Sequence, residues 1–335
     1  MTPVTTNAML PSYPVTAIPF AALKAEMLAN YGPGLAAPGT LKKLSQVLDL
    51  VEALGIRSSD QLTPELVGRF IAARPPGQSP HTLRSLLMTL RTVCSHAEEM
   101  RYVMVSPFRF RRMKISRLVR VGPPAGKRHC TRDEIRRVLV LLEQDVARKR
   151  GWAGWRSRRL LAAVATAAYT GARAGEVLRL HVDDLDLPGR IIRIRPHDRK
   201  LKTPGSEAAI GMPPALVGYL EAWLPRRLDC PLGFSIPPAD QIPWLFPGTR
   251  RQGPWTQGAP GHRPTDRVKA VAARAGVVMT FQMLRRSWCT IAEGLGLSQP
   301  QITRQARHAD PATTLRHYQQ REERNLRDAV AGFEF

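Results

Sequence analysis

Five side chains with the chemistry to act on a phosphate lie in the second half of the chain. They are two arginines, a lysine, a histidine and a tyrosine, namely Arg173, Lys202, Arg285, His308 and Tyr318. Arginine and lysine stabilise negative charge on phosphate oxygens. A tyrosine hydroxyl can attack phosphorus when neighbouring cations lower the cost of its ionised form. Because no carboxylate cluster with metal-ligand spacing accompanies them, the set predicts phosphoryl transfer in which protein cations take the place of a metal ion.

These residues stand where turns and helix ends could position them. Gly171 allows a tight turn two residues before Arg173, which then begins a helix. Lys202 falls in the turn between two short apolar runs, and Arg285 falls at the start of a helix with apolar periodicity. We therefore expect a rigid helical scaffold that presents the cations from its loops and helix starts.

Composition indicates the kind of partner. The chain has 335 residues, with 50 Lys or Arg against 27 Asp or Glu, and its net charge is +23. A charge this large favours a polyanion, nucleic acid rather than an anionic membrane surface. The first 23 residues contain four prolines and no basic residue, so we expect neither a signal peptide nor a spanning helix. The four cysteines are widely spaced, which argues against a zinc ribbon or a disulfide framework and fits a reduced cytosol. Together with the expected nucleic-acid partner, this predicts a cytoplasmic, nucleoid-associated protein.

Charge also divides the chain into parts. Residues 1–16 are uncharged and are expected to form a flexible N-terminal arm, and residues 17–107 have a net charge of only +2. Residues 108–128 carry eight basic and no acidic side chains around Gly122-Pro123-Pro124, which indicates a basic interdomain linker. DNA passing between two domains would explain eight cations in a linker. Residues 129–335 form the expected second domain, with residues 319–335 as its C-terminal tail.

Apolar periodicity predicts a mostly helical fold. In residues 17–107, helices are expected over 40–54, from Thr63-Pro64, and from Ser79-Pro80 to about residue 102. In the second domain a capping box at Thr131 and Glu134 begins a helix to about residue 146. Further helices are expected over 160–169, 214–224, 264–275, 282–295, 298–306 and 311–329, strands over 190–195 and 208–212, and a long loop over 229–262. The expected fold class is mainly α with a small antiparallel β-sheet, in two domains.

The candidate DNA-contacting side chains are basic residues of the first domain and the linker. They are Arg84, Arg91, Arg109, Arg111, Arg112 and Lys114. The first two share the polar face of the helix that begins after Ser79, opposite its leucine face.

Three motifs occur in order at plausible separations. They are T-G-x-R-x-x-E at residues 170–176, L-R at 284–285, and R-H-A-D-P-x-T-T-x-x-x-Y at 307–318. From about residue 17 onward the chain resembles a tyrosine recombinase of the phage integrase family, and residues 79–107 resemble the last helix of that family's core-binding domain. The resemblance implies a helical core-binding domain and a catalytic domain.

The resemblance also implies roles. Tyr318 would be the nucleophile that forms a 3′-phosphotyrosine bond, and Arg173 and Arg285 would clamp the phosphate oxygens. Lys202 would protonate the leaving 5′ oxygen, and His308 would hydrogen-bond the phosphate or assist proton transfer. Glu176 matches a position that supports the site without reacting. The family needs no metal or cofactor, because the covalent bond conserves the energy of the broken phosphodiester.

The sequence departs from the family pattern at two positions. Gln282 replaces a usual histidine three residues before the second arginine, and glutamine can hydrogen-bond a phosphate but cannot relay a proton. Tyr318 follows His308 by ten residues, whereas His317 occupies the more common ninth position. Lys200 lies two residues from Lys202, so the identity of the lysine stays open.

The leading functional prediction is a site-specific DNA recombinase that binds double-stranded DNA and self-associates on it, as a tetrameric synapse by resemblance. Accessory DNA-bending or directionality proteins are possible partners by the same resemblance. Two alternatives stay open. One is a type IB topoisomerase-like enzyme, which shares the chemistry but acts on one duplex alone. The other is a catalytically inactive DNA-binding relative, which only Gln282 favours.

Overall fold

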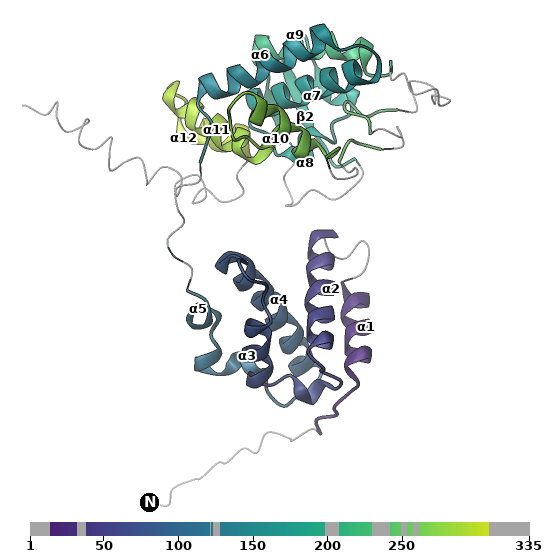
Figure 1. The fold of residues 1–335 in the computed structure, drawn as a ribbon, viewed down its shortest axis with the longest axis vertical. Coiled ribbons are helices and arrows are strands. Elements are labelled where there is room, and N and C mark those ends of the chain that lie inside the picture. The colour runs from purple at the N-terminus through teal and green to yellow at the C-terminus, as the bar shows by residue number, and fades with distance from the viewer. Residues whose placement is uncertain are drawn as a thin grey trace, which may run out of the picture. The chain divides into compact units, whose positions relative to one another are not determined.

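The computed structural model describes two compact units. The described residues are 14–31, 38–120, 122, 128–197, 208–229, 242–248, 253–256 and 261–307. The chain divides between Ala125 and Gly126, giving units Met1–Ala125 and Gly126–Phe335 (Figure 1). Across the described residues, no helix is both long and apolar enough to cross a membrane.

The first unit is a helical bundle. Its helices are α1 (Phe20–Asn30), α2 (Pro38–Ala53), α3 (Pro64–Ala72), α4 (Pro80–Glu99) and α5 (Ile115–Leu118). Each of the four long helices turns apolar residues into one core, among them Leu23, Leu48, Phe70 and Leu90. The three helices predicted in this region are confirmed as α2, α3 and α4, and the hydroxyl of Ser79 caps α4 by accepting from the Thr82 N–H. Helix α1 was not predicted, although Phe20, Leu23 and Met27 form its buried stripe.

The start of the basic segment is folded onto this first unit. Residues Pro107–Arg109 and Arg111–Met113 form short 3₁₀ helices that lead into α5. Phe108 and Val119 are buried in the first unit's core. The expected linker over 108–128 is therefore corrected for residues 108–119. Apolar residues that recur between the cations anchor this stretch, while Arg109, Arg111, Arg112 and Lys114 stay exposed.

The second unit surrounds one long buried helix. Its helices are α6 (Arg132–Arg148), α7 (Gly151–Thr170), α8 (Ala174–Val177), α9 (Pro214–Trp223), α10 (Pro264–Arg274), α11 (Phe281–Gly294) and α12 (Gln299–Ala306). Helices α6, α9, α10 and α11 all pack against α7 (Figure 1). Small side chains such as Ala162, Ala163 and Ala167 let these neighbours approach α7 closely. Because four helices pack against α7, the position of its C-terminal end is well defined within the second unit.

A three-stranded antiparallel sheet accompanies the helices. Strands β1 (Leu185–Asp186), β2 (Ile191–Ile194) and β3 (Ala208–Gly211) lie in that order, with Ile192 opposite Ile210. The buried side chains of Ile192, Ile194 and Ile210 face the core of the second unit. Strands β2 and β3 confirm the predicted hairpin, and β1 is too short to leave a pattern in the sequence.

Most helices predicted in the second unit are also confirmed. The capping box holds, since the Glu134 N–H donates to Thr131 Oγ1 at 3.1 Å and the Thr131 N–H donates to Glu134 Oε2 at 2.9 Å. Helix α7 begins at Gly151 rather than at residue 160. Its first turns hold Trp152 and Trp155, whose rings stack 5.2 Å apart, and Trp155 is buried. The helix predicted over 311–329 and most of the loop predicted over 229–262 lie outside the described residues.

Candidate active site

The site is organised by the turn that ends α7. Gly171 has φ of 66°, in the left-handed region, and its N–H donates to the Ala167 carbonyl. A Cβ at this position would lie 2.8–2.9 Å from ring atoms of Trp288 on α11. Glycine is therefore required both by backbone conformation and by the close approach of the indole ring.

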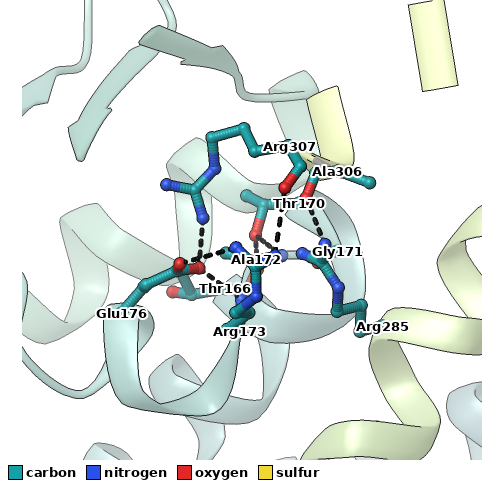
Figure 2. Close-up of polar contacts among 9 residues, drawn as sticks. All are labelled: Thr166, Thr170, Gly171, Ala172, Arg173, Glu176, Arg285, Ala306 and Arg307. Carbon is teal, nitrogen blue, oxygen red and sulfur yellow. Dashed lines mark hydrogen bonds and ion pairs between the residues drawn. The ribbon is translucent and has the colours of Figure 1, made fainter. Parts of the chain in front are cut away.

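Threonine side chains fix the same turn. The Thr170 hydroxyl donates to the Thr166 carbonyl at 2.6 Å and accepts from the Ala172 N–H at 3.2 Å (Figure 2). Both threonines are fully buried. These contacts satisfy backbone groups at the end of α7 and direct the chain into α8.

Glu176 holds Arg173 at the start of α8. The Arg173 N–H donates to Glu176 Oε2 at 2.7 Å, and Arg173 Nη1 donates to Glu176 Oε1 at 3.0 Å. The Glu176 side chain is 8% exposed, whereas that of Arg173 is 33% exposed. The carboxylate thus supports the guanidinium from the protein side and leaves part of it open to solvent.

Arg285 projects from the first turns of α11 into the same place. It is 4% exposed, and its Nη1 donates to the Gly171 carbonyl at 2.8 Å while Nη2 donates to the Ala306 carbonyl. Burial, together with the nearby charge of Arg173, lowers the pKa of Arg285 to about 10. The group is still protonated at neutral pH, and its buried positive charge favours an anionic ligand.

A third arginine completes the cluster. Arg307 Nη2 forms an ion pair with Glu176 Oε2, and Arg173 Nη2 donates to the Arg307 carbonyl at 3.1 Å (Figure 2). The Arg307 side chain is 7% exposed. Burial lowers the pKa of Arg307, and the charge of Glu176 opposes that effect. The sequence shows Arg307 beside His308, but its type and position alone did not assign it to the site.

The described cluster holds three guanidinium groups and one carboxylate. The guanidinium groups of Arg173 and Arg307 pair with the Glu176 carboxylate, and that of Arg285 donates to backbone carbonyls. The cluster therefore has an excess of positive charge and of N–H donors, which is the arrangement that binds phosphate oxygens. Among the residues that the structure describes, no group of three His, Cys, Asp or Glu side chains could hold a metal ion.

The helix that ends in this cluster also contacts the sheet. Gln305 on α12 donates through Nε2 to the Gly211 carbonyl at 3.0 Å and accepts from the Gly211 N–H at 3.0 Å. This reciprocal pair joins the last turn of α12 to β3, the strand that follows the Lys202 segment in the sequence. A lone glutamine gave no signal of this contact in the sequence.

Some of the other predicted site residues are described by the structure, and the rest lie outside the described residues. Gln282 is exposed in the first turn of α11, three residues before Arg285. Lys200, Lys202, His308 and Tyr318 lie outside the described residues. Arg84 and Arg91 are exposed on α4 of the first unit. The structure thus joins Arg173 and Arg285 in one cluster, places Glu176 against Arg173 as the sequence predicted, and adds Arg307. The remaining predicted catalytic residues stay predictions.

The family comparison bears directly on this cluster. The model of the phage integrase family matches residues 131–324, which include Arg173, Arg285, Arg307 and Tyr318. The chain belongs to the phage integrase family. The protein is accordingly a tyrosine site-specific recombinase. No curated protein matches the sequence.

Solved structures share the fold at low sequence identity. The Tn1549 transposon integrase in complex with a circular intermediate DNA is 15% identical, with a TM-score of 0.68 over 90% of this chain and 95% of that chain. XerH recombinase bound to a palindromic difH substrate is also 15% identical, with a TM-score of 0.67 over 93% and 84%. A lambda integrase dimer bound to a COC′ core site is 12% identical, with a TM-score of 0.62 over 90% and 77%.

Proposed function

We propose that this recombinase cuts and rejoins double-stranded DNA at specific sites through a 3′-phosphotyrosine intermediate on Tyr318. The observation that carries the proposal is the convergence of Arg173 and Arg285 on one turn, with the Glu176 carboxylate behind Arg173. Guanidinium groups on separate elements can contact different non-bridging oxygens of one phosphate. The motif that contains Tyr318 begins at Arg307, which is part of the same cluster.

The proposed reaction needs no external energy source. The Tyr318 hydroxyl loses its proton to His308 or to solvent water as it attacks phosphorus. A tyrosine–phosphate bond forms, and the bond between phosphorus and the 5′ oxygen breaks. Arg173 and Arg285 stabilise the charge that develops on the non-bridging oxygens. Lys202 donates a proton to the leaving 5′ oxygen, and His308 hydrogen-bonds the phosphate. Attack by a 5′ hydroxyl of a second strand then reverses these steps and releases Tyr318.

DNA binding is proposed for the basic residues of the first unit. The solved structures of the Tn1549 integrase, XerH and lambda integrase are complexes with DNA. Exposed cations occupy α4 and the folded start of the basic segment of this chain, namely Arg84, Arg91, Arg109, Arg111, Arg112 and Lys114. Such cations neutralise backbone phosphates and position the duplex without reading its sequence. Strand exchange between two duplexes requires self-association on DNA, for which we propose a tetramer.

The test is a nicked duplex that traps the covalent intermediate. We expect the unmodified protein to form a protein–DNA adduct and Tyr318→Phe to form none while its gel-shift affinity is unchanged, because only a hydroxyl is lost. Tyr219→Phe is the matched control: the Tyr219 hydroxyl donates to Glu143 at 2.6 Å, and burial and that carboxylate raise its pKa. An adduct with Tyr318→Phe would refute the assignment of the nucleophile.

The same substrates separate the other two functions. An inactive DNA-binding relative would shift the duplex and form no adduct with the unmodified protein. A topoisomerase-like enzyme would form the adduct and relax a supercoiled plasmid, but it would not exchange strands between two sites. We expect adduct formation together with exchange between two sites.

A further inference from the structure

Arg307 participates in a closed ring of three polar contacts. Arg173 Nη1 donates to Glu176 Oε1 at 3.0 Å, Glu176 Oε2 pairs with Arg307 Nη2, and the Arg307 carbonyl accepts from Arg173 Nη2 at 3.1 Å (Figure 2). Both terminal nitrogens of Arg173 are therefore oriented by the same two residues. A guanidinium group carries five N–H donors, so Arg173 retains donors beyond these two contacts.

The backbone of Arg307 is held in an unfavourable conformation. Its φ of 54° and ψ of 57° lie in the left-handed region, where a residue with a Cβ is disfavoured relative to glycine. This conformation ends α12 and lets one residue present its carbonyl to Arg173 and its side chain to Glu176. Strained backbone of this kind persists when surrounding contacts over-determine it, and it is concentrated at functional sites.

The neighbouring residues fix the place of Arg307. The carbonyl of Ala306 accepts from Arg285 Nη2, and Gln305 pairs with Gly211 on β3. Three consecutive residues at the end of α12 thus contact three different elements, which are β3, α11 and α8 with its N-cap residue Arg173. A side chain fixed this firmly can orient its partners instead of adapting to them.

We infer that Arg307 is a positioning residue of the recombinase site, which acts through Glu176 to hold Arg173 in the orientation that receives the scissile phosphate. Its guanidinium is 7% exposed and paired with a carboxylate that is 8% exposed, so it acts on the protein side of Arg173. The two arginines share the charge of Glu176, and Arg173 is not fully neutralised by that carboxylate. This inference rests on the proposed phosphoryl-transfer function.

The decisive variant is Arg307→Gly. Glycine is compatible with the left-handed conformation and keeps the carbonyl that accepts from Arg173, so the substitution removes the side chain and its pair with Glu176 while it keeps the backbone contact. We expect single-turnover cleavage of the nicked duplex to fall on the order of 10- to 100-fold, as misplacement of a positioned group does. DNA affinity and Tm should be retained. Arg307→Lys keeps a cation near Glu176 without the planar fork, so we expect a smaller loss.

Arg190→Gly is the matched control. Arg190 also has a positive φ, 52°, but it is exposed at the turn before β2. The same substitution there should leave cleavage unchanged. If Arg307 acts through Glu176, Arg307→Gly introduced into Glu176→Gln should lower cleavage less than it does alone. If Arg307→Gly lowered cleavage by the same factor in the unmodified protein and in Glu176→Gln, Arg307 would not act through Glu176.

The outcomes separate this inference from the proposed function. Unchanged cleavage by Arg307→Gly, or a loss of cleavage that accompanies a loss of Tm, overturns the positioning role. Orthovanadate, which adopts the five-coordinate geometry of phosphoryl transfer, gives a readout that does not need cleavage. It should raise the Tm of the unmodified protein and Arg190→Gly, but raise it less for Arg307→Gly and not at all for Arg173→Ala.

If the unmodified protein forms no adduct, the proposed function fails and the orthovanadate response alone decides the role of Arg307. An equal response from Arg307→Gly and the unmodified protein then overturns the inference, and a reduced response supports it. A protein that neither forms the adduct nor responds to orthovanadate overturns both.

Discussion

The buried guanidinium of Arg285 illustrates how single residues define this site. Burial of a positive charge is costly unless donors are satisfied, and here two backbone carbonyls, of Gly171 and Ala306, accept from it. Lysine cannot reproduce this geometry, because one ammonium group cannot span both carbonyls in a planar fork. Arg285 therefore both holds the turn after α7 and contributes charge to the site.

Replacing the arginines should affect chemistry more than affinity. We expect Arg173→Ala and Arg285→Lys to lower single-turnover cleavage by roughly 10²–10³, or about 3–4 kcal/mol, because their contacts strengthen as charge develops on the phosphate. Arg286→Ala, at the adjacent position on α11, is the control. Gel-shift affinity and cleavage are measured on the same nicked duplex. Equal losses in both would make Arg173 and Arg285 simple phosphate anchors.

Gly171 gives a second prediction at the residue scale. Its positive φ and the 2.8 Å distance that an added Cβ would have from the Trp288 ring both oppose a side chain. We expect Gly171→Ala to reduce the free energy of unfolding by about 2–3 kcal/mol and to slow cleavage by displacing Arg173. Gly218→Ala on α9 is the control, since nothing lies within 4 Å of its added Cβ. Thermal unfolding of the two variants measures the difference, and equal Tm values would contradict it.

At this scale the sequence predicted part of the site. Arg173 could be assigned because its motif combines a turn glycine, a cation and a supporting carboxylate at fixed spacing. Arg285 could be assigned because its Leu-Arg pair stands in order between the other two motifs of the resembled family. Arg307 and Gln305 could not, because their roles depend on where the end of α12 meets elements more than 90 residues away in the sequence. Local spacing carries no information about such contacts. Gln282 is exposed beside Arg285, where it could reach a phosphate, and its effect on rate stays a prediction.

At the scale of elements, local signals predicted most helices. The capping box of α6, the proline starts of α3 and α4 and the leucine periodicity of α4 each specify a helix through contacts within a few turns. The early start of α7 was missed because its first turns are held by long-range packing, including Trp155 Nε1 donating to the Arg227 carbonyl. The packing of residues 108–119 onto the first unit was not predicted, because the many cations of this segment indicated a linker and its apolar residues show no clear period.

An ion pair joins α6 to α10, and its contribution to the stability of the folded state should depend on pH. Asp145 on α6 accepts from Arg274 Nη1 at 2.7 Å and Nη2 at 2.9 Å, and also pairs with Lys149. Arg274 first, and Lys149 after it, hold the pKa of Asp145 at about 2. The pKa of Asp145 in the folded protein lies below its value of about 3.9 in the unfolded chain. The ion pair therefore stabilises the folded state fully above pH 4, and this stabilisation is lost as the pH falls through about 2.

Arg274→Ala measures that contribution. We expect a loss of about 1–2 kcal/mol in the free energy of unfolding at pH 7, since Arg274 is half-exposed and Lys149 remains paired with Asp145. The difference from the unmodified protein should shrink as the pH approaches 2. Arg226→Ala, which removes an exposed pair with Asp229, should cost close to nothing. Urea titrations at several pH values measure these free energies of unfolding. If the difference between Arg274→Ala and the unmodified protein did not change with pH, the loss would not come from the ion pair with Asp145.

For the whole molecule, charge predicts how DNA binding depends on salt. The segment 108–128 carries eight cations, and those described up to residue 120 are exposed. Binding that neutralises phosphates loses affinity with salt at a log–log slope of about −0.9 per phosphate. Replacing Arg109, Arg111, Arg112 and Lys114 with Ala should flatten that slope by about 3.6 if each contacts one phosphate. Arg226→Ala is the control for loss of an unrelated cation, and an unchanged slope in the fourfold variant would place the segment away from the DNA backbone.

An apolar groove on the second unit is a candidate surface for assembly on DNA. This groove of about 1220 Å³ is lined by apolar side chains of α6, the β3 end and α11, including Leu139, Met212, Ile291 and Leu295. Arg304 and Gln305 of α12 also line it. Residues 329–335 include the apolar side chains of Val330, Phe333 and Phe335. In the family that the chain resembles, the segment after the nucleophile commonly docks on a neighbouring protomer. By that resemblance we propose that residues 329–335 of a neighbouring copy dock in this groove on DNA.

Truncation after Asp328 tests this assembly. If the tail docks on a neighbour, the truncated protein should bind a single site with unchanged affinity but fail to form synapses, because it loses apolar area only in the assembly.

Leu295→Asp should reproduce the defect, since Leu295 is 62% exposed and lines the groove. Val278→Asp is the matched control, because Val278 is 60% exposed and does not line the groove. Gel shifts with one and two sites, and strand exchange between two sites, measure the effect. Normal synapsis by the truncated protein would refute docking, and a fall in its Tm without DNA would place the tail on its own subunit.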